Sequence, residues 1–411
     1  MRPQHYAKQI DLFDHVAGAY AQPESGPLRN AELYRMAVSR AQISKEHLNE
    51  TLPIGKACSE RSPIKQRIRW HQQELARLGL LQKVEGQRGV WELTETGKAK
   101  LRKARPDVAV LAFSTNLGVA IWGNCTKAFG DWNEPIFLGL SSPPFPLSRP
   151  RDYGNPPIEE YIKFICRTIA PLVRNLVKGG NLVLNLGDVF DRHSPAKSTY
   201  IEELTLALKA EFGLSLMNRI VWQSNKPPGP TQWASLKRTQ LNEAYEFCLW
   251  FCNDPVACIA NNQRVLEPHT AKHKKLIAKG GENRFSVNGD GAYRIKPGSY
   301  GRQTEGKLAR NIFSVSNHCS SQRAYKKRAR ELGLATHGAT MPLNLARKLV
   351  RFLTDVGQLV VDPFGGSMTT PLACELENRE WAASEIVYDY VRGGAERFVD
   401  CPGFELAIDA L

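Results

Sequence analysis

The chain has 411 residues, of which 42% are hydrophobic and 23% are charged, a composition typical of a globular protein with two or three domains. We find no run of about 18 apolar residues and no basic N-terminal stretch followed by an apolar one, so we expect neither a membrane-spanning helix nor a secretory signal. We therefore expect a cytoplasmic protein. Nine cysteines without a Cys-x-x-Cys pair argue against a disulfide framework or a zinc ribbon.

The net charge of +14 is concentrated in two segments. Residues 1–105 carry 19 Lys and Arg against 11 Asp and Glu, and residues 255–335 carry 16 against 5. Solvated surface side chains could account for such an excess. Because duplex DNA is a dense line of negative charge, two separate basic segments instead favour a protein that binds nucleic acid.

The N-terminal quarter is predicted to hold an arm and a small module. Residues 1–28 contain three prolines, and we expect a mostly irregular arm. The following pattern predicts three helices and then two strands, at residues 31–40, 45–50, 63–78, 80–84 and 90–93. The third helix places Lys65, Arg69 and Gln72 opposite an apolar stripe. This pattern resembles a winged helix, which can contact DNA or serve only in dimerisation.

An apolar strand at residues 135–140 leads into Ser142-Pro143-Pro144-Phe145. Two prolines end the strand and hold the neighbouring carbonyls in fixed directions, which makes them rigid acceptors. The exocyclic amine of cytosine or adenine could donate to the Ser142 hydroxyl while Phe145 stacks on the ring. A plain turn is the alternative interpretation of this tetrapeptide alone.

Strands and helices alternate through the next hundred residues and predict a mostly parallel sheet. Helices are expected at residues 158–177, stopped by Gly179-Gly180, and at 200–212, and strands at 108–112, 119–122, 181–186, 214–222 and 246–251. Trp222 precedes a proline-rich loop, residues 225–230, which contains Lys226 and could line a base pocket. Core packing is the alternative for Trp222. Residues 255–335 are Gly-rich and basic without a dominant period.

Near the C-terminus, a predicted helix at residues 344–353 precedes a strand that ends in Asp362-Pro363-Phe364-Gly365-Gly366-Ser367-Met368-Thr369-Thr370. A strand, an acid, a glycine turn and a Thr-capped helix start are typical of a nucleotide-like cofactor site. A second strand ends at Glu385, and a carboxylate there can accept from both ribose hydroxyls of such a ligand.

Together, the Ser142 and Asp362 motifs resemble the DNA amino-methyltransferases. The resemblance implies a Rossmann-like α/β fold that binds S-adenosylmethionine, without a metal. The Ser-Pro-Pro-Phe loop precedes the cofactor loop, which matches the circularly permuted beta group. The family commonly has a glycine where Met368 stands, a difference that matters if this residue has positive φ.

The resemblance also implies roles for individual residues. The catalytic loop is Ser142, Pro143, Pro144 and Phe145. The residues expected to bind S-adenosylmethionine are His337, Thr340, Pro342, Asp362, Phe364, Gly365, Gly366, Ser367, Thr369, Thr370 and Glu385. The residues expected at the target base or the DNA are Arg149, Arg151, Tyr153, Trp222 and Lys226.

Residues 142–155 look similar to the Pvu II type of cytosine-N4 methyltransferase, where Ser-Pro-Pro-Phe is also followed by a basic residue and Tyr-Gly-Asn. This similarity favours methylation of cytosine N4 in double-stranded DNA, with the base flipped out, by an enzyme of a restriction-modification system. A cognate restriction endonuclease would act separately, and the enzyme would lie on the nucleoid through its DNA. The alternatives are an adenine-N6 enzyme of the same architecture and an inactive DNA-binding protein. No Pro-Cys dipeptide is present, which disfavours carbon-5 methylation.

The expected domain order follows from these assignments. It consists of an arm (1–28), a winged-helix-like domain (29–105), a catalytic half (106–254), a target-recognition region (255–335) and an S-adenosylmethionine-binding half (336–411).

Overall fold

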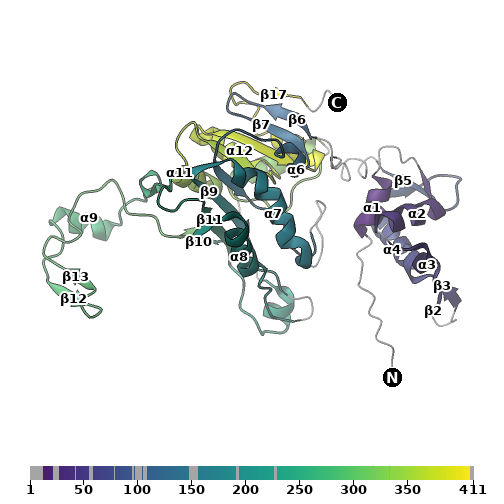
Figure 1. The fold of residues 1–411 in the computed structure, drawn as a ribbon, viewed down its shortest axis with the longest axis horizontal. Coiled ribbons are helices and arrows are strands. Elements are labelled where there is room, and N and C mark those ends of the chain that lie inside the picture. Colours follow the sequence, from purple (N-terminus) through teal and green to yellow (C-terminus); the bar gives the residue numbers. More distant parts are fainter. Residues whose placement is uncertain are drawn as a thin grey trace.

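The structure is a computed structural model of the whole chain, and two bodies of secondary structure account for most of it (Figure 1). The residues that it describes are 13–21, 27–41, 43–54, 59–77, 79–94, 97, 104, 109–147, 156–190, 194–225, 229–317, 319–332 and 334–407. None of the helices in these segments is long and apolar enough to span a membrane.

The N-terminal module is a three-stranded sheet in the order β1-β5-β4, packed against helices. Its elements are α1 (Phe13–Tyr20), β1 (Leu28–Arg29), α2 (Asn30–Arg40), α3 (Lys45–Asn49), β2 (Leu52–Ile54), β3 (Ser59–Arg61), α4 (Pro63–Arg77), β4 (Leu81–Lys83) and β5 (Val90–Leu93). Buried apolar residues from α1, α2, α4 and all three strands form one core. The predicted helices and hairpin are therefore present.

Two expectations for this module need correction. The segment expected to be a mostly irregular arm, residues 1–28, includes α1, which contributes Val16 and Tyr20 to the core of the module. Gln72 does not lie on an exposed face of α4: it is buried, and its Nε2 donates to the Tyr20 hydroxyl at 2.7 Å. Both corrections have one cause. Helix α1 packs against the side of α4 that contains Gln72, and the sequence pattern had assigned that side to solvent because Gln72 is polar.

The second body is a ten-stranded sheet whose five central strands run parallel. In spatial order its strands are β14 (Ile312–Ser314), β10 (Ser215–Gln223), β11 (Tyr245–Cys252), β9 (Leu176–Leu186), β8 (Ile136–Ser141), β15 (Leu359–Asp362), β16 (Glu380–Glu385), β7 (Gly118–Gly123), β6 (Ala109–Ser114) and β17 (Glu405–Leu406). Antiparallel pairs at both sides flank the parallel centre. Strand β8 thus lies beside β15, which follows it by more than 200 residues.

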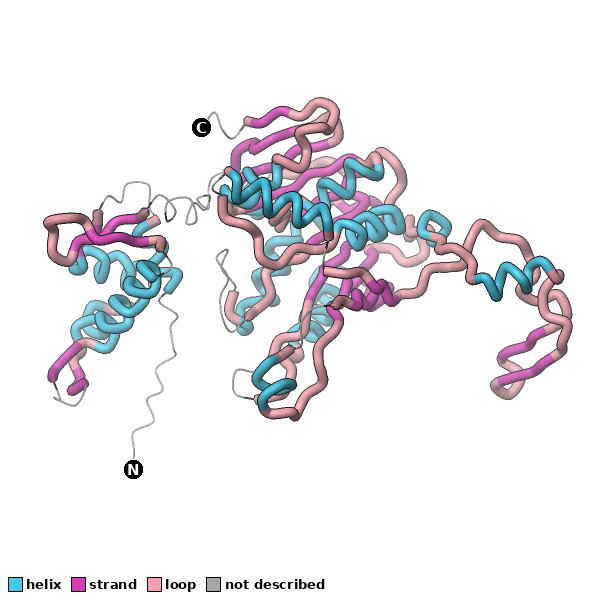
Figure 2. The backbone as a smooth tube through the Cα atoms, turned by 180° about the vertical axis from the view of Figure 1, so that it is seen from behind, coloured by secondary structure: helices cyan, strands magenta, loops and turns pink. Residues whose placement is uncertain are grey.

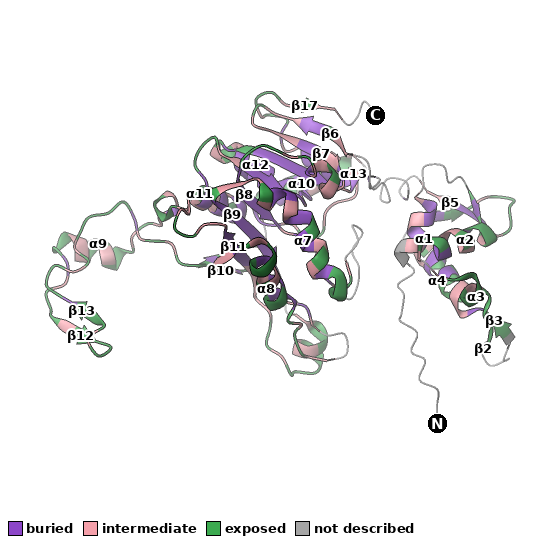
Figure 3. Ribbon diagram, viewed as in Figure 1, coloured by how far each residue is buried: buried purple, intermediate pink, exposed green. Residues whose placement is uncertain are grey.

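Helices cover both faces of this sheet (Figures 1 and 2). Along β9, Leu182 and Leu184 pack with α7 (Ile158–Arg174) and α8 (Tyr200–Phe212). Val183 points to the opposite face, whose core comes largely from α11 (Leu343–Leu353), α12 (Thr369–Glu377) and α13 (Tyr388–Ala395). The alternation follows the two-residue period of a strand, and both faces of the central strands are buried (Figure 3).

Strand β9 begins five residues earlier than predicted, and Gly179-Gly180 lies inside it instead of ending α7. Gly179 has φ +76°, and a Cβ there would lie 1.9 Å from the carbonyl oxygen of Ala257. Gly179 therefore allows the backbone at Ala257 to lie close to an irregular point in the strand. From the sequence alone, such a glycine looks the same as one that ends a helix.

The basic segment 255–335 does not form one unit. Helix α9 (Ala271–Ala278) and the hairpin of β12 (Ser286–Asn288) and β13 (Tyr293–Ile295) extend away from the sheet and are largely exposed (Figures 1 and 3). By contrast, β14 pairs with β10, and α10 (Ser320–Glu331) packs on α13. The last part of the segment therefore belongs to the body of the large sheet, although its composition resembles that of the exposed residues 271–295.

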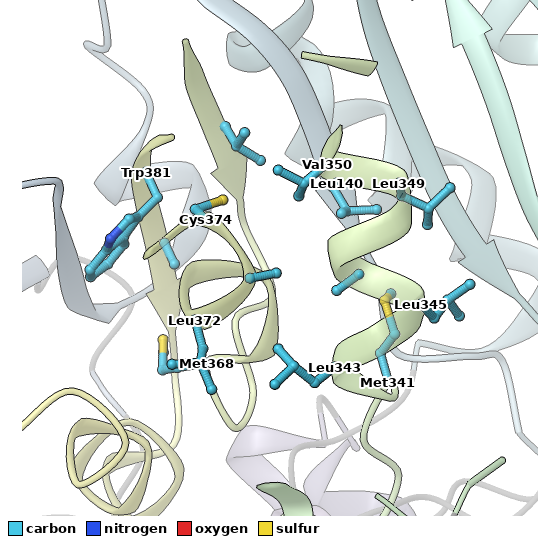
Figure 4. Close-up of a cluster of buried hydrophobic side chains, with 14 of the residues drawn as sticks. Leu140, Met341, Leu343, Leu345, Leu349, Val350, Met368, Leu372, Cys374 and Trp381 are labelled. Carbon is cyan, nitrogen blue, oxygen red and sulfur yellow. The ribbon is translucent and has the colours of Figure 1, made fainter. Parts of the chain in front are cut away.

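Met368 lies beside Leu372 at the start of α12, in the hydrophobic core that α12 shares with α11 and β16 (Figure 4). It is fully buried and has φ +59°, a left-handed conformation that costs a residue with a side chain about 1–2 kcal/mol. Its side chain packs against Gly394 of α13, where an added Cβ would lie 2.8 Å from the Met368 Cγ. The burial of Met368 thus offsets the backbone cost, and Gly394 supplies the space.

We expect Gly394→Ala to lower the free energy of unfolding by about 1–3 kcal/mol, because the new methyl group overpacks the site against Met368. In a Met368→Gly background the same substitution should cost little. Urea denaturation of the four proteins in this double-mutant cycle measures the coupling.

Gly393→Ala is the matched control, because it is in the same helix but its Cβ would face Ala329 at 3.2 Å. Its cost should not change when Met368 is replaced. Equal costs of Gly394→Ala in both backgrounds would show that Met368 and Gly394 do not compete for space.

Candidate active site

The predicted site residues gather at one edge of the large sheet. Strands β8, β15 and β16 are adjacent and parallel, so their carboxyl ends, at Ser141, Asp362 and Glu385, lie side by side. Ligands of open α/β sheets bind beyond this end of the strands. A cavity of about 820 Å³ opens there, and a smaller one of about 40 Å³ adjoins it, with Ser142, His337, Ala339 and Phe364 lining both.

The Ser142 hydroxyl is oriented by a hydrogen bond to a neutral side-chain amide, that of Asn185. Its Oγ donates to the Asn185 Oδ1 at 3.2 Å, and the Asn185 Nδ2 donates to the carbonyl oxygen of Phe247 at 3.2 Å. Asn185 is buried near the end of β9, and its second bond fixes the orientation of its amide. The lone pairs of the Ser142 oxygen are therefore left to accept a hydrogen bond from the cavity.

Phe145 lies on the floor of the same cavity. A Cβ built on Gly187 would lie 2.9 Å from the Phe145 Cε2 and 3.5 Å from the Cγ of Glu246. Only a glycine at 187 leaves room for the aromatic ring in this position. Pro143 and Pro144 complete the wall between Ser142 and Phe145. The loop thus presents a hydroxyl and an aromatic ring to one space.

Asp362 is a buried carboxylate that ties the two predicted loops together. Its Oδ1 accepts from the Ser141 Oγ at 2.5 Å and from the Phe364 backbone N–H at 3.0 Å. Burial raises the pKa of Asp362, and these hydrogen bonds oppose the rise. A cation bound beside it in the small cavity would favour the ionised form.

Glu385 fixes the glycine turn to the end of β16. Its Oε2 accepts from the backbone N–H of Gly366, and its Oε1 from that of Val387, both at 2.8 Å. Burial raises the pKa of Glu385 to about 7, against these backbone hydrogen bonds and with a smaller contribution from the charge of Asp362. Each oxygen keeps a lone pair for a ligand hydroxyl, and the carboxylate lines the large cavity.

The glycine turn has a backbone conformation that favours glycine. Gly366 has φ +52°, and a Cβ there would be in ordinary contact, at 3.5 Å, with the imidazole of His337. Arg397, which sequence reasoning missed, donates from Nη1 to the Ser367 carbonyl oxygen at 2.7 Å and to the Thr369 Oγ1 at 3.0 Å. Burial lowers the pKa of Arg397 to about 10, so it remains charged at neutral pH. Its two hydrogen bonds stabilise the conformation of the turn.

Most predicted residues therefore line the two cavities. The large cavity holds Ser142, Pro143, Pro144, Phe145, His337, Phe364 and Glu385. The small cavity holds Thr340, Asp362, Gly365, Gly366, Ser367, Thr369 and Thr370. Pro342 is placed differently, because it precedes the first residue of α11 and lines neither cavity.

The expectation that Trp222 contacts the base is wrong. Trp222 is buried on β10 within the hydrophobic core, and its indole N–H donates to the carbonyl oxygen of Val315 at 2.8 Å. Core packing, the alternative that the sequence left open, is what the structure shows. The other residues expected at the DNA, Arg149, Arg151, Tyr153 and Lys226, lie outside the described residues.

Several cavity residues carried no recognised signal. Phe164, on α7, packs its ring 5.7 Å from that of Phe364. Lys163 and Arg167 are exposed on the same helix and line the cavity, as does Glu246 at the start of β11. The spacing of Lys163, Phe164 and Arg167 within a predicted helix could have indicated that they share one face. For Glu246, the only signal in the sequence was its position at the start of a predicted strand.

Comparisons with known proteins agree with this geometry. Residues 137–396 match the family model described as DNA methylase (N6_N4_Mtase), and residues 17–103 match the Mrr N-terminal domain. The chain is 29% identical to the type II methyltransferase M.PvuII of Proteus hauseri over 293 residues, which cover 70% of this chain and 86% of that protein. It is 23% identical to M.BamHI of Bacillus amyloliquefaciens over 290 residues, which cover 67% and 56%.

A solved structure is also similar. It is the PvuII DNA methyltransferase (cytosine-N4-specific), with a TM-score of 0.55 and 26% identity over 70% of this chain and 88% of that one. The matched DNA methylase region includes both the Ser142 loop and the Asp362 turn, which line adjoining cavities. The chain therefore belongs to the DNA methylase family of N6 and N4 methyltransferases.

Proposed function

We propose that this protein transfers a methyl group from S-adenosylmethionine to the N4 atom of cytosine in double-stranded DNA. One observation carries the proposal: the hydroxyl and ring of the Ser142–Phe145 loop face the cavity that Glu385 lines, next to the small cavity of Asp362. A site that can hold the amine to be methylated is thereby adjacent to a site for a cationic, nucleoside-like methyl donor. Methyl transfer needs such alignment more than it needs a protein nucleophile.

The residues present fit S-adenosylmethionine. Asp362 would accept from its ammonium group, Glu385 from its ribose hydroxyls, and Phe364 would support its adenine. Gly366 leaves room that a Cβ would reduce beneath His337. When bound, this cofactor supplies a methyl carbon attached to an excellent leaving group.

The chain's own residues prepare the acceptor. We infer that Phe145 stacks on a flipped base while Ser142 accepts from its exocyclic amine, which fixes the direction of the nitrogen lone pair. Positive charge develops on this nitrogen as the new bond forms, so the acceptors bind more strongly in the transition state. Asn185 is a neutral amide and only orients the hydroxyl; the proton of the methylated amine therefore goes to another acceptor, such as solvent.

Chemistry through a cysteine is disfavoured. Among the described residues that line the cavity, Cys125 is the one thiol, and burial raises its pKa to about 11. A thiol that stays protonated at neutral pH is a poor nucleophile for addition to a pyrimidine ring.

Cytosine is favoured over adenine by the similarity to M.PvuII and to the PvuII structure, whose title specifies cytosine N4. Adenine N6 is the second candidate, because the family model spans both chemistries and the Ser142 hydroxyl can accept from either amine. M.PvuII and M.BamHI are both type II methyltransferases by name. Their names support the proposal of a restriction-modification enzyme, which would lie on the nucleoid and have a separately acting endonuclease.

We also propose that the exposed part of the basic segment recognises the target sequence. Helix α9 carries Lys272, Lys274 and Lys275, and the β12–β13 hairpin carries Arg294 beside Tyr293, whose side chain is 57% exposed. Cationic and aromatic side chains of this kind can contact both phosphates and base edges.

The identity of the product tests the function directly. DNA incubated with the protein and S-adenosylmethionine, digested to nucleosides and resolved by mass spectrometry, should contain N4-methylcytosine. N6-methyladenine would establish the second candidate instead. If no methylated base forms and S-adenosylmethionine does not bind while the affinity for DNA is intact, the protein is an inactive DNA-binding protein.

Mutations in the two parts of the site should have different effects, on methyl transfer and base binding in one part and on cofactor binding in the other. Ser142→Ala should lower kcat by about 10²–10³-fold, the loss seen when one hydrogen-bonding group that stabilises a transition state is removed. Phe145→Ala should weaken binding of the flipped base by about 1–3 kcal/mol. Neither should change cofactor affinity measured by calorimetry.

Asp362→Asn is the matched variant in the other half. It keeps an oxygen for Ser141 and the Phe364 N–H but removes the charge, so cofactor affinity should fall about 10–100-fold. Equal losses of cofactor binding in all three variants would contradict the division of roles.

Cofactor affinity should depend on pH through Glu385. Its raised pKa of about 7 means that the free enzyme holds a proton there below pH 7, and this proton must leave before the carboxylate can accept from two ribose hydroxyls. Binding of S-adenosylhomocysteine should therefore weaken up to about tenfold from pH 8 to pH 6, with proton release near pH 7. Glu385→Gln should bind weakly and flatten the profile; a profile that stays unchanged in this variant would assign the titration to another group.

A further inference from the structure

Three carboxylates line the large cavity among the described residues, those of Glu160, Glu246 and Glu385. Glu385 accepts from the backbone of the glycine turn, and Glu160 is exposed in the first turn of α7. Glu246 is half-buried at the start of β11, and none of the base and cofactor contacts inferred above involves it. A carboxylate in the cavity that holds the reacting group is a candidate for a part in the reaction.

The register of the sheet places Glu246 on the same face as Asn185. Cys248 of β11 is paired directly with Asn185 of β9, and residues that oppose each other in this way point to one face, as do residues two apart on one strand. Glu246 is therefore a diagonal neighbour of Asn185, about 7–8 Å away across the two strands. Because β11 runs antiparallel to β9, this step leads toward the carboxyl end of β9, where the cavity opens.

Glu246 also adjoins the catalytic loop. The Ser142 Oγ donates to Asn185, and a Cβ built on Gly187 would lie 2.9 Å from the Phe145 Cε2 and 3.5 Å from the Glu246 Cγ. The ring and the carboxylate side chain thus lie next to the same point of the chain. A base stacked on Phe145, with its amine at Ser142, would have Glu246 at its edge.

Methylation of an amine leaves a proton to be removed. The nitrogen lone pair forms the bond to the methyl carbon, and the carbon–sulfur bond breaks with its electron pair staying on sulfur. The nitrogen then carries a positive charge and must release one of its two hydrogens. The Ser142 hydroxyl and a backbone carbonyl can accept a hydrogen bond but are too weakly basic to hold a proton at neutral pH, whereas a carboxylate can take it.

The other basic groups lie on the opposite side of the cavity, where the methyl donor is expected. His337 lies against Gly366, and Glu385 accepts from the Gly366 N–H, beyond β15 and β16. Strand β11 is on the other side of β8 and β9. Because the amine attacks with its lone pair directed at the donor, its N–H bonds point away from the donor. A proton acceptor therefore has to lie on the side of the base, where Glu246 is.

We propose that Glu246 is a catalytic residue, which accepts a hydrogen bond from the exocyclic amine of the flipped base and takes its proton as the methyl group is transferred. The proton then passes to water, which restores the carboxylate. This inference rests on the proposed function, and it applies to cytosine N4 and adenine N6 alike because both are exocyclic amines.

The kinetic experiment compares the full-length protein with Glu246→Gln under single-turnover conditions. The glutamine keeps the size of the side chain and an oxygen that can accept a hydrogen bond, but it cannot take a proton. The rate of methyl transfer should fall about 10²–10⁴-fold, the contribution typical of a general base. The affinity for S-adenosylhomocysteine, measured by calorimetry, should stay the same.

A binding experiment without cofactor tests the contact itself. The unmodified protein and Glu246→Ala are each titrated with two duplexes, one with the normal target base and one in which that base lacks its amine (2-pyrimidinone for cytosine, purine for adenine). Loss of the amine should weaken binding about tenfold more in the unmodified protein than in Glu246→Ala, because a charge-assisted hydrogen bond is lost only there. The easier unpairing of the altered base affects both proteins equally and cancels in this cycle.

Glu243→Gln is the matched control. Glu243 lies three residues before Glu246 but outside the cavity, where its Oε1 is 2.9 Å from the Lys197 Nζ, and Lys197 keeps a second partner in Asp188 at 2.6 Å. This variant should methylate DNA at nearly the rate of the unmodified protein, and circular dichroism should show that all variants melt like it.

A normal transfer rate in Glu246→Gln, an equal loss in Glu243→Gln, or a binding cycle without coupling would overturn the proposal. An effect on KM alone would also overturn it, because Glu246 would then bind the base without taking its proton. If the unmodified protein forms no methylated base, the proposed function fails as well. If it methylates DNA and Glu246→Gln does so at the same rate, only the role of Glu246 is refuted.

Discussion

The hydrogen bond between Ser141 and Asp362 is the interaction on which the site depends. It joins residues that lie 221 positions apart in the chain, at the ends of two adjacent parallel strands, and both partners are buried. A hydroxyl that donates to a buried carboxylate is a charge-assisted bond and is costly to lose, because the carboxylate would remain without water. The loop that would hold the base is therefore fixed relative to the turn that would hold the methyl donor.

Two buried carboxylates in one site create an electrostatic requirement. The pKa of both Asp362 and Glu385 is raised by burial, and the charge of Asp362 adds to the rise at Glu385. Without a cation nearby, ionising both is unfavourable. A bound ligand that carries an ammonium and a sulfonium group would bring positive charge to this site and would favour ionisation of both carboxyl groups.

The sequence predicted the parts of this protein that depend on local patterns. The Ser142 loop, the Asp362 turn, Glu385 and the boundaries of α8 follow from prolines, glycines and apolar periods, and each is where it was expected. The errors involve contacts between distant segments. Gln72 is polar in sequence but bonds to Tyr20 of a helix that was not predicted, and Gly179 looks like a helix stop but leaves room for the carbonyl of Ala257. Trp222 is as compatible with a core as with a base pocket, and only the pairing of β10 with β11 and β14 decides.

Met368 shows how a departure from a family pattern can be accommodated. A methionine in a left-handed conformation has a backbone cost, which is offset here because its side chain is buried and Gly394 lies opposite it. The turn therefore keeps the backbone shape that glycine elsewhere provides, and the side chain adds a contact between the turn and α13 that a glycine could not make. Since Arg397, on the segment after α13, donates to the carbonyl of Ser367, this part of the chain supports the turn at two neighbouring residues. The helix that follows the second cofactor strand is thus a structural part of the site, although it contributes no residue to either cavity.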